Sequence, residues 1–496
     1  MKKPFFLPLI ATVIFLAGCS DDTPDKPLPQ ISWEVASGRF QVLTGETLTL
    51  VPSVAYTDET TTYTWATDKG ETVGHEATYT FCSSQEGTYY LTLCVTNQAG
   101  AATDEIKITV ERPQEETEPY LPAADSSLAG WRFPEVASHI ALGRTMLVRA
   151  CFTLPDSMAT YTWTLDGEEV EGLPEQTAYP FEAKEEGIHQ LTLTATTDTL
   201  TLSHSFTIEV CPPAGTYRRP PTANSQAMVD RVYAYMPAPG HQVNGYSVVG
   251  RAFPTPCTHE QACDTVWQHF QRRWMVSLGA CGGYLIAGFD HSVENSGGYD
   301  LCIKGNPFNY QSEPGIIWVS QDENGDGLPN DTWYELAGSE YGNANWEPAY
   351  AITYYRPRYP QCATAWRDHH GDTGMVPYMS YWNREPYYWQ EWVEGSEHTF
   401  FGTRLASHHS YDGGATQMPP YAWGYADNMG SDLYDSPVWQ AGRYKISQAR
   451  TWDGEPIHLE YIDFVKVQTA QTGWTPNLGE ISTEVYYIGD IHLDTP

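Results

Sequence analysis

Apolar and polar residues alternate in short runs along much of the chain, as in Thr47-Leu48-Thr49-Leu50 and Ile106-Lys107-Ile108-Thr109-Val110. A period of two residues predicts β-strands that bury one face, because successive side chains of a strand point to opposite sides of the sheet. Stretches rich in Gly, Pro, Asn and Asp separate these runs and predict turns. The pattern therefore predicts a protein that is mainly β.

A repeat divides the first part of the chain. Thr62-Tyr63-Thr64-Trp65 recurs as Thr160-Tyr161-Thr162-Trp163, and Gly87 with Leu91-Thr92-Leu93 recurs as Gly187 with Leu191-Thr192-Leu193. A period of about 100 residues filled with short strands is typical of tandem immunoglobulin-like sandwiches. We expect two such domains, at residues 31–112 and 119–212, joined by a Pro- and Glu-rich linker from Glu111 to Pro119.

Both segments resemble PKD-like domains in their Tyr-x-Trp strand and in a late Gly-x-Tyr/His-x-Leu-Thr-Leu strand. The Gly-Asp-Gly turn that usually follows the tryptophan is missing, so the resemblance is firmer for the immunoglobulin-like superfamily than for the subtype. Trp65 and Trp163 fit either a ligand platform or a core plug, and a tryptophan in the middle of such a strand is usually core. We expect core positions, and domains that act as spacers.

The third module is expected at residues 222–496, where 13 of the 17 tryptophans lie. One helix is predicted there, because Thr258 and Gln261 form a capping-box pattern ahead of an apolar stripe. The predicted strands are Gly283–Phe289, Asp300–Lys304, Gly315–Val319, Ala349–Tyr355 and Tyr461–Val467. The predicted fold is thus two immunoglobulin-like (PKD-like) sandwiches followed by a larger, jelly-roll-like β-sandwich with a short helix.

The first residues predict a lipoprotein signal peptide at 1–18. Lys2 and Lys3 precede an apolar run that ends in the box Leu16-Ala17-Gly18-Cys19. The run is short for a membrane span, and small residues before a cysteine suit a processing peptidase. We expect cleavage before Cys19, lipidation of Cys19 and a polar tether over residues 19–30, with an uncleaved membrane anchor as the alternative.

Ser20-Asp21-Asp22 resembles the surface-export signal of Bacteroidetes lipoproteins, although an ordinary linker has the same composition. The expected location is the outer membrane, lipid-anchored, at the cell surface. The formal net charge of −35 argues against nucleic acid as a partner, because phosphates require a basic surface. Besides Cys19 there are nine cysteines, for which Cys82–Cys94, Cys151–Cys211 and Cys257–Cys263 are candidate disulfides.

Several motifs of the third module form a second resemblance. They are Gly288-Phe289-Asp290-His291, Lys304-Gly305-Asn306, Ser312-Glu313-Pro314-Gly315, Trp423-Gly424-Tyr425-Ala426-Asp427-Asn428 and Ile462-Asp463-Phe464-Val465. The module resembles the C-terminal domain of Bacteroidetes cell-surface lipoproteins that accompany corrinoid transporters. The resemblance implies cobalamin as a ligand and an outer-membrane TonB-dependent transporter as a partner.

An oxygen-rich loop is a candidate calcium site. Asp322, Asn324 and Asp326 occupy positions one, three and five, with Gly327 at six, which matches the start of an EF-type loop. Position twelve is Trp333, so Asp331 or Glu335 would supply the late carboxylate. The alternative is a plain turn, since Asn, Gly and Asp also favour turns. Any calcium here would be structural.

The candidate ligand surface is an aromatic segment without periodicity, which predicts a loop, and rings on loops usually contact something. Its residues and expected neighbours are Tyr381, Trp382, Asn383, Arg384, Tyr387, Tyr388, Trp389, Trp392, Trp423, Tyr425, Asn428 and Trp439. Rings of this kind suit the apolar face of a corrin macrocycle or of a sugar. The alternative is that they pack under the loop against the sandwich.

No nucleophile elbow, zinc-protease helix or phosphate-binding loop is present in the sequence. His369-His370 and His408-His409 are poor chelates if they lie on strands, because adjacent strand residues face opposite ways. We therefore expect no catalysis but a surface lipoprotein that binds a nutrient, cobalamin by resemblance, for a transporter. A carbohydrate-binding or adhesive lipoprotein is the second hypothesis, and a glycoside hydrolase with an unrecognised pair of acids is the third.

Overall fold

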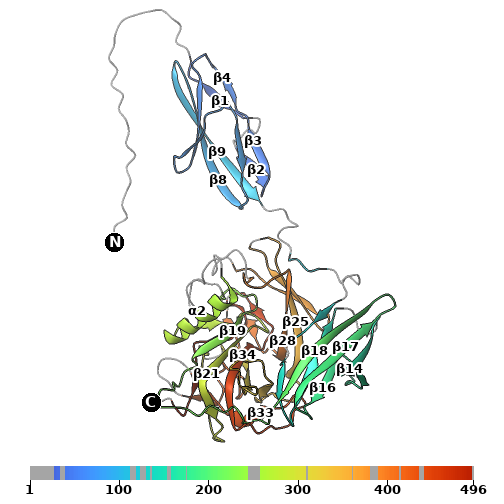
Figure 1. Cartoon of the computed structure of the whole chain (residues 1–496). Helices are drawn as coiled ribbons and strands as arrows, with labels where there is room; N and C mark the ends of the chain where they lie inside the picture. Colours follow the sequence, from blue (N-terminus) through green and yellow to red (C-terminus); the bar gives the residue numbers. More distant parts are fainter. Residues whose placement is uncertain are drawn as a thin grey trace, which may run out of the picture. The chain divides into compact units, whose positions relative to one another are not determined.

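The computed structural model describes residues 27–493 except 34–38, 112–118, 123–129, 135–136, 154–157, 175, 244–256, 309–310, 360, 380–388, 413–414, 435–440 and 477. The chain divides into two compact units, residues 1–115 and 116–496 (Figure 1). The first unit holds one sandwich, and the second holds another sandwich together with the large third module.

The first sandwich is a five-stranded sheet opposed by two strand pairs. The sheet order is β2 (Arg39–Leu43), β9 (Gly100–Glu111), β8 (Gly87–Asn97), β5 (Thr62–Thr67) and β6 (Thr72–Gly74). The pairs are β3 (Thr47–Leu50) with β7 (Tyr79–Cys82), and β1 (Gln30–Ser32) with β4 (Ser53–Ala55). Alternate residues of β8 and β9 point inward around Trp65, which is fully buried.

The second sandwich repeats this topology strand for strand. Its sheet order is β11 (His139–Ala141), β18 (Thr201–Cys211), β17 (Gly187–Thr196), β14 (Thr160–Leu165) and β15 (Glu168–Val170). The pairs are β12 (Thr145–Arg149) with β16 (Ala178–Glu182), and β10 (Trp131–Arg132) with β13 (Cys151–Phe152). Trp163 is 2% exposed in its core, so both tryptophans are core plugs as predicted.

The third module is layered around a six-stranded sheet. That sheet runs β19 (Arg231–Met236), β21 (Tyr284–Glu294), β34 (Tyr461–Thr469), β23 (Gly315–Ser320), β24 (Trp333–Leu336) and β33 (Ala449–Arg450). Two four-stranded sheets accompany it: β31 (Leu433–Tyr434), β32 (Ala441–Tyr444), β22 (Leu301–Lys304), β38 (Tyr487–Asp490), and β27 (Thr373–Val376), β26 (Thr364–Asp368), β25 (Trp346–Tyr355), β28 (Glu397–Leu405). Short pairs complete the module: β20 (Val276–Ser277) with β37 (Glu484–Val485), β29 (Ser410–Asp412) with β30 (Ala415–Gln417), and β35 (Trp474–Thr475) with β36 (Gly479–Glu480).

The central sheet is buried on both faces, as the alternation in β21 shows. Leu285 and Ala287 belong to a core shared with β22, β38 and the helix α2 (His259–Gln271). Tyr284 and Ile286 belong to another core, shared with β25 and β28. Thr258 and Gln261 form the predicted capping box of α2, which the structure confirms. A 3-10 turn, η3 (Ile446–Gln448), precedes β33.

The second sandwich packs on the third module rather than standing apart from it. The backbone N–H groups of Ser138 and His139 donate to the carbonyl of Asn330, at 2.9 and 3.3 Å. Arg144 of the sandwich pairs with Glu323, and Arg132 pairs with Glu397. The prediction that this domain is a spacer is therefore wrong, because its surface arginines meet acidic groups of the third module.

The predicted fold class is confirmed: the protein is mainly β, with immunoglobulin-like sandwiches and a larger β-sandwich module. The predicted strands correspond to β21, β22, β23, β25 and β34. Residues 1–26, with the predicted signal peptide, Cys19 and most of the tether, lie outside the described residues, as does most of the predicted linker at 112–118. Among the described residues, no helix is long and apolar enough to cross a membrane.

Candidate ligand-binding site

Four side chains form a row across the central sheet. In the strand register Lys466 of β34 lies opposite Trp318 of β23, Trp318 lies opposite Glu335 of β24, and Glu335 lies opposite Arg450 of β33. Residues directly opposite each other in an antiparallel pair project from the same face of the sheet. The row therefore combines an ammonium, an indole, a carboxyl and a guanidinium group on one face.

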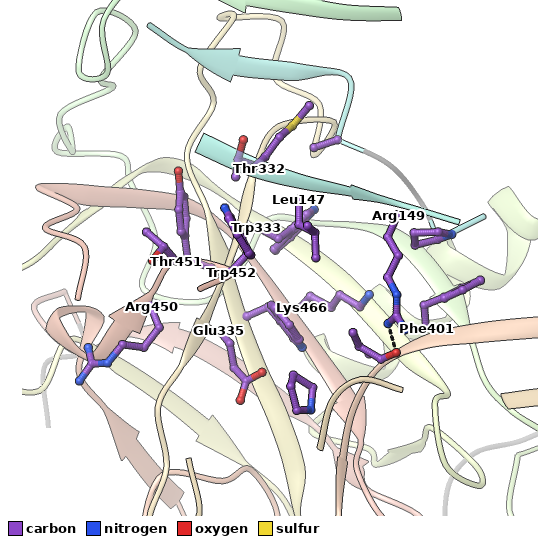
Figure 2. Close-up of a pocket in the computed structure, with 18 of the residues that line it drawn as sticks. Leu147, Arg149, Thr332, Trp333, Glu335, Phe401, Arg450, Thr451, Trp452 and Lys466 are labelled. Atoms are coloured by element: carbon purple, nitrogen blue, oxygen red, sulfur yellow. Dashed lines mark hydrogen bonds between the residues drawn. The ribbon is translucent and has the colours of Figure 1, made fainter. Parts of the chain in front are cut away.

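This row forms the floor of a cavity of about 240 Å³, which we call the intermodule cavity. One wall comes from the second sandwich, through Thr145, Leu147 and Arg149 of β12. The other wall comes from β25 and β28, through residues such as Trp346 and Phe401. Figure 2 shows side chains of both modules pointing into the same space, with Arg149 bonded to a backbone oxygen across it.

Aromatic rings form part of the lining of the cavity. They are Trp318, Trp333, Tyr334, Tyr341, Trp346, Phe401 and Trp452. Trp452 is 36% exposed, whereas Tyr341 packs on Trp346 with ring centroids 4.4 Å apart. Cavities that hold small ligands are usually lined in this way, by aromatic groups with a few polar groups among them.

Glu335 is the carboxyl group of the cavity floor, and it is 5% exposed. Trp346 Nε1 donates to one of its oxygens at 2.8 Å, and Thr403 Oγ1 donates to the other at 2.5 Å. Burial raises the pKa of Glu335 to about 7, although both hydrogen bonds lower it. Near neutral pH this group is therefore present in both forms. The carboxylate can accept a hydrogen bond from a ligand, and the protonated acid can donate one to it.

Trp318 carries a further polar group at the cavity. Its Nε1 is buried and has no hydrogen-bond partner within the part of the chain that the structure describes. A buried donor without an acceptor is costly, so an oxygen supplied from outside would stabilise it. The cavity thus combines ring faces for an apolar surface with donors for oxygen atoms.

The predicted aromatic surface fares differently. Tyr381, Trp382, Asn383, Arg384, Tyr387, Tyr388 and Trp439 lie outside the described residues. Trp389, Tyr425 and Asn428 are 6%, 1% and 2% exposed, so the expectation that they lie on an exposed surface is wrong for these three. Asn428 bonds the backbone of Tyr421 with both ends of its amide. Trp392 and Trp423 are half-buried, and neither lines the intermodule cavity.

The lack of periodicity predicted an exposed aromatic loop. Side chains that pack beneath a loop also follow no regular spacing in the sequence, so the pattern does not separate the two cases. The cavity residues were missed for a related reason. Trp318, Trp346 and Lys466 belong to mostly buried strands without clear alternation, and only the tertiary arrangement brings them together. The signal that was present is a large or charged side chain at an otherwise apolar strand position, as in Ile317-Trp318-Val319.

The candidate calcium residues Asp322, Asn324, Asp326 and Asp331 lie in the loop between β23 and β24. The backbone N–H groups of Gly325 and Gly327 donate to the Asp322 carboxylate at 2.7 and 3.1 Å. Both glycines have positive φ, 77° and 74°, as a tight loop of this kind requires. Glu335, the alternative late ligand, belongs to the cavity instead, because its carboxyl bonds Trp346 and Thr403.

The histidine pair His369-His370 lies in the turn between β26 and β27, not on a strand. Both rings consequently fall on the same side, with centroids 3.9 Å apart, and His370 Nε2 lies 2.5 Å from Glu347 Oε1. These three residues form a group that could hold a metal ion. However, Ala351 N–H donates to His369 Nδ1, which leaves the proton of that ring on Nε2, and Arg404 already pairs with Glu347.

Another acidic group of the third module consists of the half-buried Glu313 and the buried Asp427 and Glu484. Burial raises the pKa of all three, that of Glu484 to about 7.

The proposed disulfides do not form: Cys82, Cys94, Cys211, Cys257 and Cys263 are free thiols, which excludes the pairings Cys82–Cys94, Cys151–Cys211 and Cys257–Cys263. Desolvation raises the pKa of Cys263 to about 11, so this thiol is not a nucleophile at neutral pH.

Fold and cavity together define a multidomain β protein in which one immunoglobulin-like sandwich completes a cavity of a larger module. Comparison with known families adds one assignment: residues 34–110, in the first sandwich, match the model of the PKD domain. No curated protein matches the chain.

Solved structures that resemble the chain contain tandem immunoglobulin-like or fibronectin-like domains. The titin domains Z1Z2 in complex with telethonin are 14% identical over 38% of this chain and 99% of that chain, with a TM-score of 0.16. The fibronectin(III)-like modules of Clostridium thermocellum CbhA are 11% identical over 39% and 100%, also with a TM-score of 0.16. Likenesses at such TM-scores say nothing about function.

Proposed function

We propose that this protein is a lipid-anchored cell-surface receptor that binds an amphipathic nutrient in the intermodule cavity. A corrinoid such as cobalamin is the leading ligand, and an outer-membrane TonB-dependent transporter is the proposed recipient. The lipoprotein box at Cys19, the strongly acidic composition and the motifs of the third module support this proposal. The observation that carries it is the row Lys466, Trp318, Glu335 and Arg450 beneath a lining of rings.

The chemistry of the cavity suits one edge of a corrinoid. The apolar face of a macrocycle would pack on the exposed ring of Trp452. An amide at the rim would enter the cavity, where its oxygen would accept from Trp318 Nε1 and its N–H would donate to Glu335. Binding of this kind requires no chemical step, which is the reason for proposing a receptor.

A carbohydrate-binding surface protein is the second candidate, and the size of the cavity favours it. A volume of about 240 Å³ lies below the range of roughly 300–1,000 Å³ that encloses drug-sized ligands. A single sugar ring would fill it, with its C–H face on an indole. A glycoside hydrolase receives less support, because hydrolysis ordinarily uses two carboxyl groups and Glu335 is the one among the described lining residues.

Calorimetry with the soluble chain beginning after Cys19 tests the ligand. Cyanocobalamin should release or absorb heat and quench tryptophan emission at micromolar concentration. Trp452→Ala should weaken binding at least tenfold, because it removes the exposed ring at the cavity. Trp274→Ala is the matched control, since Trp274 is equally exposed, at 37% against 36%, and lies outside the cavity.

Absence of heat and of quenching with cyanocobalamin would remove the corrinoid proposal. Binding of a glycan that Trp452→Ala abolishes would establish the carbohydrate hypothesis in its place. Equal losses in both tryptophan variants would show that the intermodule cavity is not the site.

The anchor is tested separately in cells. Cys19→Ser should abolish incorporation of labelled palmitate and move the protein from the membrane fraction to the soluble fraction, because a thioether-linked lipid requires the cysteine sulfur. Ser20→Ala is the control and should keep both properties. An unlabelled wild type, or a Cys19→Ser variant that stays in the membrane, would contradict the lipoprotein proposal.

A further inference from the structure

Positive charge is scarce in this protein, because the chain has 27 lysines and arginines against 62 acidic residues. Several of its arginines lie within ion-pair distance of a carboxylate: Arg132, Arg144, Arg218, Arg219 and Arg404. One group of cations on the third module differs from these, because its members gather around aromatic rings instead of acids.

The first members of this group lie at the end of α2 and on β22. Arg273 and Lys304 both lie over the ring of Tyr487, with Arg273 Cζ 4.3 Å and Lys304 Nζ 4.6 Å from the ring centroid. Arg272 Cζ lies 5.2 Å from the ring centroid of Trp274. One cation is enough for a cation–π contact, so the second cation over Tyr487 adds repulsion between like charges.

Two further cations continue the group. Arg443 and Lys445 both lie over the ring of Tyr299, 4.7 and 5.0 Å from its centroid. Arg443 of β32 lies opposite Cys302 of β22, and Lys304 follows Cys302 by two residues. Residues two apart on a strand share a face, so Lys304 and Arg443 are diagonal neighbours, about 7–8 Å apart, on one face of the sheet. We call the whole group, Arg272, Arg273, Lys304, Arg443 and Lys445, the basic patch.

Among the described residues, acids offset little of the charge of the basic patch. Apart from Arg443, no patch residue forms an ion pair within these ranges. Arg443 differs: burial raises the pKa of Asp432, and the charge of Arg443 lowers it in part. Glu260 and Asp264 of α2 lie about 18 and 12 Å from Arg272 along the helix axis. Both distances exceed the Debye length of about 8 Å at physiological ionic strength, so the local field at the patch is positive.

The basic patch is accessible where α2 ends. Arg272 and Arg273 are exposed, Trp274 is 37% exposed, and Lys304 and Lys445 are half-buried. An exposed indole flanked by cations is the combination that suits a membrane surface, because the indole lies at the level of the headgroups and the cations meet lipid phosphates.

We propose that the basic patch binds the phosphate groups of an anionic lipid surface and thereby holds the third module against the membrane. This inference rests on the lipid anchor of the proposed function only for the presence of a membrane beside the protein. An anchored chain has a high effective concentration at that surface, so a weak second contact is sufficient. The exposed indole and the anchor favour a lipid surface over an acidic protein as the partner.

Co-sedimentation with vesicles tests the patch, with the full soluble chain beginning after Cys19, which carries no lipid. We expect binding to vesicles of phosphatidylglycerol mixed with phosphatidylcholine, and none to phosphatidylcholine alone. Salt at 1 M should abolish the binding, because the Debye length falls to about 3 Å. Arg272→Gln and Arg273→Gln should each weaken binding about fivefold, and the double variant roughly 25-fold.

Arg358→Gln is the matched control. Arg358 is exposed like Arg272 and also lies over a ring, that of Tyr120 at 3.7 Å, but it is not part of the basic patch. Its substitution removes the same charge and should leave vesicle binding unchanged. Because Arg272 and Arg273 are exposed, both variants should melt within a few degrees of the wild type, which separates loss of binding from loss of the fold.

Equal binding to both kinds of vesicle, or equal losses in Arg273→Gln and Arg358→Gln, would overturn the proposal. Binding to polyglutamate but not to vesicles would also overturn it and would identify an acidic protein as the partner of the patch. The soluble chain has no anchor and the assay contains no nutrient, so a negative result here is distinct from failure of the palmitate test or of the calorimetry with cyanocobalamin.

Discussion

Glu335 is a buried residue of the cavity floor and also a candidate contact for a ligand. Its two hydrogen bonds, from Trp346 and Thr403, favour the charged carboxylate, whereas its removal from water favours the neutral acid. Burial is the larger effect and places the pKa at about 7 instead of 4.5. Glu335 is therefore the residue of the cavity floor whose charge changes near neutral pH.

The stability of the protein should depend on this titration. Because the folded-state pKa is raised, the folded state holds the Glu335 proton more tightly than the unfolded state does. The contribution is complete below about pH 4.5 and is lost as pH rises to about 7, with an upper limit on the order of 3 kcal/mol. Glu335→Gln should remove it, since glutamine stays neutral.

The measurement is urea unfolding of both proteins at about pH 5 and about pH 8. The wild type should lose stability relative to Glu335→Gln between the two conditions, and all other acids cancel in the comparison. A difference between the two proteins that stays the same at both pH values would show that Glu335 does not titrate in this range.

At the scale of elements, the edge of the second sandwich is held by two arginines in unlike surroundings. The Arg144–Glu323 pair is buried, with side-chain exposures of 12% and 1%. The Arg132–Glu397 pair is open to water, with exposures of 26% and 41%. Removing one partner of a buried pair leaves the other charge buried without a partner, whereas an exposed carboxylate that loses its partner is hydrated by water.

We therefore expect Arg144→Ala to destabilise the second unit by roughly 3–5 kcal/mol. Arg132→Ala is the matched control and should cost below about 1 kcal/mol. Denaturant unfolding followed by tryptophan emission measures both values. Equal effects of the two substitutions would show that Glu323 is solvated in spite of its burial.

At the scale of the molecule, the chain consists of two units with separate cores. The core around Trp65 draws its buried residues from positions 50 to 110, and the cavity draws its lining from residue 134 onward. Every described residue that lines the intermodule cavity belongs to the second unit, and the second sandwich supplies one of its walls.

Scanning calorimetry of the whole soluble chain should resolve two transitions for this reason. A chain that begins at Glu116 should lose one of them and keep the other within about 2 °C, because each buried cluster of the described residues lies within one unit. A single transition, or a displaced one after truncation, would show that the two units unfold together.

The local features of this protein could be predicted from its sequence. Alternation located the strands, the Thr258 and Gln261 pair located the start of α2, and the repeat around Trp65 and Trp163 gave two sandwiches and their core plugs. These predictions succeed because hydrogen bonding and side-chain direction within a strand or helix depend on neighbouring residues. The oxygen-rich loop was also legible, because its turn chemistry is local.

The position of the candidate site, in contrast, depends on contacts between distant parts of the chain. Trp318, Glu335 and Lys466 meet because β23, β24 and β34 are paired in one register, and no local pattern encodes which strands become neighbours. Burial was equally non-local: Trp389 and Tyr425 lie beneath other elements, so their aromatic character did not reveal whether they face water. The docking of the second sandwich, which supplies one wall of the cavity, includes the buried pair of Arg144 and Glu323, and these residues lie too far apart in the sequence for a local pattern to reveal their contact.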